Sequence, residues 1–458
     1  MRPGFKVVGL VVILLLIWSA LFASTFRYPF YWDDFHLIRP YSGSQLLSVF
    51  HGVVDPDKIE TPGLRPVSTF LYNFQGSLFG ENIVLQRTFL IALMGVLLCA
   101  VGILLLELGL RLIQIAIVLV LFVFSRVFAS LVLWISLSHV ILAYIFIVLT
   151  ASFFLVWLKR RRSIFFVAML TVAVMATFNR EEAYTLPVVL PLLWLISSAD
   201  RGRWRAVLLA AVTLFLIVCF HYALWHFMIP EALSPRFSLH SAGTFLKAIA
   251  ASWLPGGFTM IGLTDLIIGF LWVAFLIALI VIFLRTSRGY VRWQFLGTCC
   301  VGILLSLPAI GKGRAFGISL PTLAFMTAVS IAIVEVCQQF RFRHAQRYAF
   351  LGTVILGLAI GICGGIRRSE YLAESLQQDC AVRAERDGEF LFDLFQRPAT
   401  IPEERRQAGI ARLSALGIKS KEDARNLQQE LKENRGRYER SGEDRQLLFQ
   451  SKYEYLSF

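Results

Sequence analysis

The chain has 458 residues, of which 57% are hydrophobic and only 16% are charged. Soluble proteins are about 45–50% apolar and about 25% charged, so this composition excludes a water-soluble globule for most of the chain. Long apolar runs account for the mean hydropathy of +0.68, and each is long enough to cross a bilayer core of about 30 Å as a helix. The net charge of +14 identifies no partner until the charges are located, so it does not by itself indicate nucleic acid.

Eleven apolar runs predict an all-α polytopic membrane protein with about 11 transmembrane helices. They cover residues 7–25, 84–106, 112–130, 138–157, 164–178, 183–198, 206–227, 261–284, 293–310, 315–336 and 348–366. With the N-terminus in the cytoplasm, the turns on that side hold sixteen basic and three acidic residues. The positive-inside rule therefore predicts a cytoplasmic N-terminus, and an odd number of spans predicts an extracytoplasmic C-terminus. A cleaved signal peptide is the alternative for the first span, but its apolar run is long and no clear small-x-small site follows.

Two segments are expected outside the bilayer. The first is the outer loop 26–83, which is rich in aromatic residues. The second is the tail 367–458, which holds 17 basic and 17 acidic residues in helix-like patterns. We therefore predict a transmembrane catalytic domain over residues 1–366 and a small helical extracytoplasmic tail over 367–458. The Pro- and Gly-containing segment 229–260 is expected to act as a lid over the outer side.

Adjacent carboxylates follow the first span, in the run Tyr28-Pro29-Phe30-Tyr31-Trp32-Asp33-Asp34-Phe35. Like charges repel, and neighbouring apolar rings raise the cost of ionising a carboxyl group. One of the two is therefore a candidate general base. The alternative is a solvated turn or a helix N-cap.

Other candidate residues lie at the predicted outer ends of the spans. Arg65 is a basic residue that could extend to lipid headgroups, and Arg87 either lines the site or anchors a helix at the interface. The charged run at Arg180, Glu181 and Glu182 suits either a salt-bridged turn or an active-site lining. The remaining candidates are Tyr72 and His139 as lining residues and Lys312 and Arg314 as basic residues near the late spans. His139 is also readily explained as a hydrogen-bonded core residue.

The order of these features resembles a known family. Asp33-Asp34 after the first span, Arg65-Pro66, the aromatic stretch, Phe79-Gly80-Glu81-Asn82 and Arg87 are similar to the first luminal loop of GT-C glycosyltransferases. The similarity is greatest to the protein O-mannosyltransferase and aminoarabinose-transferase branch. Trp134-Ile135, Arg180-Glu181 with Leu186-Pro187, and Arg314 with Pro321 resemble later elements of the same group. Ser138-His139 and Ala315 depart from its pattern, which leaves the acceptor open.

The resemblance implies an activity. Enzymes of this family move one sugar from a polyprenyl-phosphate carrier to an acceptor hydroxyl, usually with inversion, on the outer side of the membrane. Asp33 would then be the general base, and Asp34 would orient the acceptor or Asp33. Arg65, with Lys312 and Arg314 as second candidates, would contact the donor phosphate.

The implied partners are the lipid bilayer, the lipid-linked sugar and a glycan, lipid or protein acceptor, with no nucleic acid, cofactor or metal. Compact loops favour the inner membrane of a bacterium. A secondary transporter is an alternative, although transporters show inverted repeats and polar residues near the midplane. A membrane scaffold that acts through the charged tail is a second alternative.

Overall fold

The computed structural model describes most of the chain. The described residues are 3–27, 37–38, 40–51, 64–80, 82–197, 201–228, 263–312, 319–339, 344–396, 410, 413 and 418–429. Asp33, Asp34, Arg314 and the whole of the expected lid 229–260 lie outside these residues, and only the backbone of Lys312 is described. Every regular element in the described part is helical, which confirms the all-α prediction.

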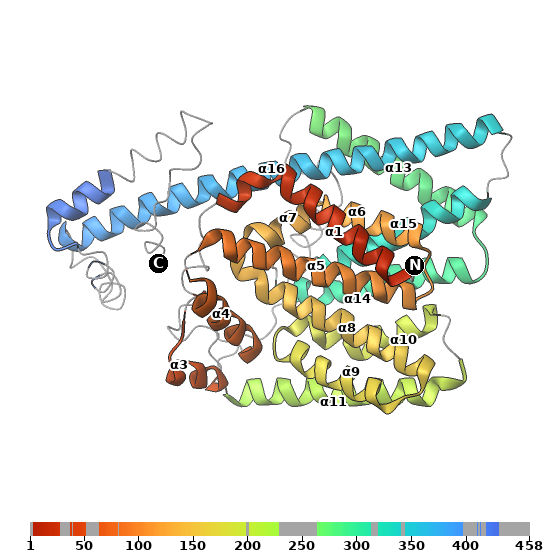
Figure 1. The fold of residues 1–458 in the computed structure, drawn as a ribbon, viewed down its shortest axis with the longest axis horizontal. Helices are drawn as coiled ribbons and strands as arrows, with labels where there is room; N and C mark the ends of the chain where they lie inside the picture. Colours follow the sequence, from red (N-terminus) through yellow and green to blue (C-terminus); the bar gives the residue numbers. More distant parts are fainter. Residues whose placement is uncertain are drawn as a thin grey trace.

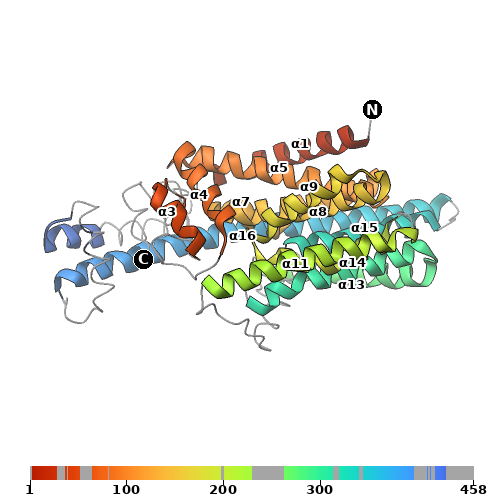
Figure 2. The same cartoon turned by 90° about the horizontal axis from the view of Figure 1, so that it is seen from below.

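The helices pack side by side into an elongated bundle, with the short α3 and α4 at one end (Figures 1 and 2). The bundle consists of α1 (Pro3–Leu21), α5 (Ile83–Glu107), α6 (Leu112–Val123), α7 (Arg126–Leu133), α8 (Ser138–Arg160), α9 (Ser163–Thr177), α10 (Leu186–Ile196), α11 (Trp204–Met228), α13 (Leu263–Thr286), α14 (Tyr290–Lys312), α15 (Ser319–Gln339) and α16 (His344–Gln396). The segment between α1 and α5 holds η1 (Ala23–Arg27), α3 (Gly43–Ser48), η2 (Val49–His51) and α4 (Pro66–Phe79). Three more short 3-10 helices are η3 (Ile135–Leu137), η4 (Glu181–Thr185) and η5 (Arg201–Arg203).

Each of the eleven predicted apolar runs overlaps a helix. Among the described residues, eight helices are long and apolar enough to cross a membrane, or nine if the bent pair of α6 and α7 is one span. The remaining two, α9 and α10, have 15 and 11 residues, which is shorter than the roughly 20 residues of an average span. The chain is therefore a multi-pass membrane protein, and the count of eleven spans stays a prediction.

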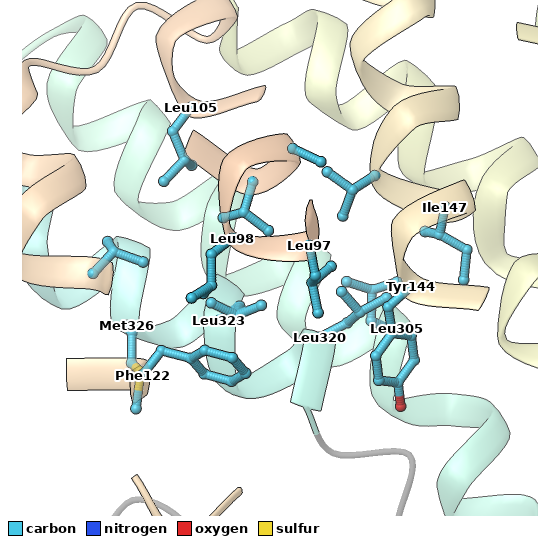
Figure 3. Close-up of a cluster of buried hydrophobic side chains, with 14 of the residues drawn as sticks. Leu97, Leu98, Leu105, Phe122, Tyr144, Ile147, Leu305, Leu320, Leu323 and Met326 are labelled. Atoms are coloured by element: carbon cyan, nitrogen blue, oxygen red, sulfur yellow. The ribbon is translucent and has the colours of Figure 1, made fainter. Parts of the chain in front are cut away.

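The core lies where α5, α6, α8, α14 and α15 meet. Large aliphatic and aromatic side chains interdigitate there, as Figure 3 shows for Leu97, Leu98, Leu105, Phe122, Tyr144, Ile147, Leu305, Leu320, Leu323 and Met326. α8 and α15 are the most deeply buried of the candidate spans, whereas α1, α11 and α16 expose most of their side chains. The outward apolar side chains suit contact with lipid rather than water.

A bend of 56° separates α6 from α7. The Ser125 hydroxyl donates to the Phe122 carbonyl at 2.7 Å, and its oxygen accepts from the Phe128 backbone N–H at 3.3 Å, which caps the new helix. α16 passes this bend at Gly365, where a Cβ atom would lie 2.0 Å from the Phe124 carbonyl oxygen. Only glycine permits this approach.

α16 has 53 residues and extends well past the bundle (Figure 1). The helix runs through residue 366 without a break, so the predicted boundary between the two domains has no mark in the secondary structure. Near its far end, Lys421 and Arg425 lie 5.7 Å from the Phe392 ring centroid. These contacts hold the helical segment 421–429 against α16.

Candidate functional site

Two ion pairs form at the end of the bundle where α8 and α10 begin. Their carboxylates belong to adjacent residues, Glu181 and Glu182. Arg65, the N-cap residue of α4, donates from Nη2 to both carboxylate oxygens of Glu181, at 2.7 and 2.9 Å. Arg180 donates from Nε and Nη2 to the two carboxylate oxygens of Glu182, at 2.8 and 2.6 Å. The side chains of the first pair are only 15% and 9% exposed, and those of the second are buried. The start of α4 is thus joined to η4 by a largely buried pair of charges.

Arg180 also fixes the protonation of His139. Its Nη1 lies 3.2 Å from His139 Nε2, and a guanidinium has only donors, so Nε2 accepts. The proton of the neutral imidazole is then on Nδ1, which lies 2.7 Å from the Ser136 carbonyl oxygen and 2.5 Å from the Tyr72 hydroxyl. The Tyr72 hydroxyl donates to the same carbonyl at 3.0 Å. His139 is therefore held neutral in one tautomer.

Neutral polar side chains tie α4 to this cluster. The Ser68 hydroxyl donates to Asn179 Oδ1 at 2.6 Å, and Asn179 Nδ2 donates to the His139 carbonyl at 3.1 Å. About two turns further along α4, Gln75 Oε1 accepts from the Ser138 hydroxyl at 2.6 Å. All four side chains are buried. The polar side of α4 is thus hydrogen-bonded to the start of α8 and to the turn that carries the charged residues.

A second histidine links the same elements from α11. His221 Nε2 lies 3.1 Å from the Leu64 carbonyl, which only accepts, so Nε2 carries the proton. Its Nδ1 therefore accepts from the Tyr184 hydroxyl at 2.7 Å. Leu64 precedes Arg65, and Tyr184 belongs to the 3-10 helix that contains Glu181. His221 is consequently hydrogen-bonded both to the residue that precedes Arg65 and to the 3-10 helix that contains Glu181.

Arg87 has a different position. Its side chain is 1% exposed, and Nη1 donates to the Val132 and Leu133 carbonyls at 3.1 and 2.9 Å. These carbonyls end α7, where a cation interacts favourably with the helix dipole. Arg87 therefore caps α7 and supports the turn that leads to Ser136. This burial does not fit an anchor in contact with lipid headgroups.

The cluster lies at the opposite end of the bundle from the most basic turn. His139 is near the start of α8 and Lys159 is near its end, so about 30 Å of helix separates them. Lys159 pairs there with Glu107 at 2.8 Å, and the arginines that follow it are exposed. The basic turn after α8 and the ion-paired cluster, which the sequence predicts on opposite sides of the membrane, thus lie at opposite ends of α8.

The electrostatics of the cluster keep its charges in place. Burial lowers the pKa of the Arg180 guanidinium, but the Glu182 carboxylate beside it outweighs this effect and the pKa stays above its ordinary value. Its charge is therefore permanent, and the two ion pairs together are neutral. Within the described part of the chain, no three His, Cys, Asp or Glu side chains are placed to hold a metal ion.

Six of the predicted site residues are brought together: Arg65, Tyr72, His139, Arg180, Glu181 and Glu182. The pairing of Arg65 with Glu181 does not fit an arginine that extends to lipid headgroups. The network also contains Ser68, Asn179, Tyr184 and His221, which were not predicted from the sequence. A polar residue on an otherwise apolar helix was the available signal for His221, but the other three are of types too common near turns to be distinguished.

No protein-family model and no curated protein sequence matches the chain. Among solved structures, the chain is similar to the oligosaccharyltransferase of Archaeoglobus fulgidus in its apo form, with 13% sequence identity and a TM-score of 0.42. The match covers 87% of this chain and 58% of the archaeal protein. At this identity and TM-score, the likeness assigns no activity to the chain.

Proposed function

We propose that the chain is a membrane glycosyltransferase that moves one sugar from a polyprenyl-phosphate carrier to an acceptor hydroxyl on the extracytoplasmic side. The supporting observation is the largely buried Arg65–Glu181 pair, which joins the loop that contains Asp33 to the turn that contains Arg180. Burying paired charges has a large desolvation cost and is weak as a source of stability. Charged clusters at one end of an apolar bundle are therefore candidates for function.

Arg65 is the proposed contact for the donor phosphate. Its Nε–H is buried and has no hydrogen-bond partner within the described residues. An unsatisfied buried donor is unfavourable, and a phosphate oxygen is the kind of acceptor that would satisfy it. When the glycosidic bond breaks, negative charge develops on the phosphate, and a guanidinium stabilises that charge without a metal. Glu181 would hold Arg65 in place before the donor binds.

Asp33 is the proposed general base, with Asp34 as its neighbour. A single displacement with inversion needs one carboxylate to remove the acceptor proton during attack. His139 is a poor alternative because Arg180 occupies its only available lone pair. Lys312 and Arg314 are second candidates for phosphate contact, by family resemblance. The sugar and the acceptor are not specified by these residues.

The proposed orientation has the N-terminus in the cytoplasm and the cluster outside it. It is supported by the sixteen basic residues on one set of turns and by the separation of Lys159 from His139 along α8. We further propose that the membrane is a bacterial inner membrane and that the tail 367–458 lies outside the cytoplasm.

The donor contact is tested with purified chain in vesicles, with polyprenyl-phosphate mannose as the probe donor and released polyprenyl phosphate as the readout. Arg65→Lys keeps the charge but removes the Nε–H, so we expect a rise in the donor KM of about tenfold or more. Arg160→Lys, at the opposite end of α8, is the matched control and should leave the donor KM unchanged. An unchanged KM in Arg65→Lys would refute the phosphate contact.

A further inference from the structure

One side of α4 and the preceding short helices is apolar and exposed. Phe70, Phe74 and Leu78 are 46%, 48% and 60% exposed, and their spacing of four residues aligns them along one side of the helix. Leu47 of α3 and Phe50 of η2 are also exposed. The Phe50 and Phe70 rings are 6.5 Å apart, so these residues form one surface. We call these five residues the outer-loop apolar surface.

α4 buries its polar side and exposes its apolar side, which is the reverse of an amphipathic helix at the surface of a soluble protein. Such a helix buries its apolar side and exposes its polar side. In α4 the buried side contains Ser68, Tyr72 and Gln75, each hydrogen-bonded to the bundle. The helix has the sequence PVSTFLYNFQGSLF, which includes no charged residue. An uncharged helix with its apolar side outward is suited to contact with lipid rather than with water.

The outer-loop apolar surface continues into a membrane-spanning helix. The Phe89 ring of α5 lies 5.9 Å from the Phe74 ring and 5.4 Å from the Phe79 ring. Val84 and Leu85, on the first turn of α5, are exposed beside this contact. α5 is among the helices apolar enough to cross a membrane, so its exposed side faces lipid. Figures 1 and 2 both show α3 and α4 at the end of the bundle where α5 begins.

We infer that the outer-loop apolar surface is embedded in the outer leaflet, at the boundary between headgroups and acyl chains. Its partner is the lipid surface, because the apolar exposure is continuous with the lipid-facing side of α5 and because aromatic side chains are favoured at that depth. Arg65 is the N-cap residue of α4, and Tyr72 lies on the buried side of this helix, opposite its exposed apolar side. The ion-paired cluster is thereby held at the level of lipid headgroups. This placement does not depend on the proposed sugar transfer.

The test is photocrosslinking of the full chain in vesicles of phosphatidylethanolamine and phosphatidylglycerol. The photoreactive residue p-benzoylphenylalanine replaces Phe74, with Val96 on the exposed side of α5 as the lipid-facing reference. Glu422, exposed in the helical segment 421–429, gives the background. After irradiation, mass spectrometry measures lipid adducts on each site. We expect the lipid adduct at Phe74 to equal that at Val96 and to exceed that at Glu422 by about tenfold.

The inference is overturned if p-benzoylphenylalanine at Phe74 labels a second copy of the chain, or another segment of the same chain, and lipid labelling stays at the Glu422 level. The same replacement at Phe70 provides a second site for the measurement, in case one variant does not fold. Each variant is included only if its size-exclusion profile and melting temperature match those of the unaltered chain. The readout requires no donor or acceptor, so failure of the proposed activity would leave this result unaffected.

Discussion

Replacing Glu181 with glutamine removes the carboxylate that neutralises Arg65 and leaves a mostly buried guanidinium with a weaker partner. Two unit charges about 4 Å apart attract by about 4 kcal/mol at an effective dielectric constant of about 20. Removing one partner from a fully buried pair costs about 3–5 kcal/mol. Because Arg65 keeps 15% of its surface in contact with solvent, we expect a smaller loss of about 2–3 kcal/mol.

A double-mutant cycle isolates the pair. The variants are Arg65→Gln, Glu181→Gln and their combination, and the apparent free energy of unfolding is measured by SDS titration in mixed micelles. We expect a coupling energy of about 2 kcal/mol. The control cycle uses Lys159 and Glu107, whose side chains are 32% and 27% exposed, and should give no more than about 0.5–1 kcal/mol.

Equal coupling energies in the two cycles would contradict a stronger interaction in the Arg65–Glu181 pair. That result would mean that the site pair is as well solvated as the surface pair, and that its burial does not set its strength. It would also remove the main physical reason to regard the cluster as a functional site, although the fold assignment would be unaffected.

Two further predictions concern the hydrogen bonds of His221 and the close approach of Gly365 to the bend between α6 and α7. His221→Ala removes the hydrogen bonds to the Leu64 carbonyl and the Tyr184 hydroxyl; we expect a loss of about 1–3 kcal/mol in the same SDS titration. His226→Ala, on the exposed side of the same helix, is the control and should change the free energy by less than about 0.5 kcal/mol. Equal losses in the two variants would contradict a role for His221 in the cluster. Gly365→Ala places a Cβ against the Phe124 carbonyl and should lower the melting temperature, with a cost of about 1–3 kcal/mol. Gly352→Ala, with open space around it, should be neutral or slightly stabilising, as is usual for alanine in a helix. A Gly365→Ala variant as stable as the unaltered chain would refute the close approach at the bend.

The helices were predictable because apolar length is a strong constraint in a membrane. The run 84–106 differs by one residue at each end from α5, whose Asn82 caps the first turn. The run 112–130 was expected to be one span, but the structure breaks it between α6 and α7. Ser125 and Arg126 are the local signals for that break, whereas the approach of Gly365 from far along the chain is not visible in the local pattern.

The site was predictable only in part. Arg65 was selected by family resemblance and Glu181 as part of a charged run, but they are 116 residues apart and their pairing depends on how α4 packs on η4. The charges of Arg180 and Glu182 were expected either as a structural turn or as site lining, and they form an ion pair that also contacts His139. Sequence patterns identify charged residues at helix ends, whereas tertiary packing decides which of them meet.

We propose that Asp33 accepts the acceptor proton during sugar transfer from a polyprenyl-phosphate donor. The most direct measurement is the rate of polyprenyl-phosphate release from polyprenyl-phosphate mannose in vesicles that contain the unaltered chain, Asp33→Asn or the control Asp393→Asn, which is exposed on α16. We expect donor turnover by the unaltered chain and by the control, and a loss of about 10²–10⁴-fold in Asp33→Asn. Full turnover in Asp33→Asn would contradict the assignment of the base.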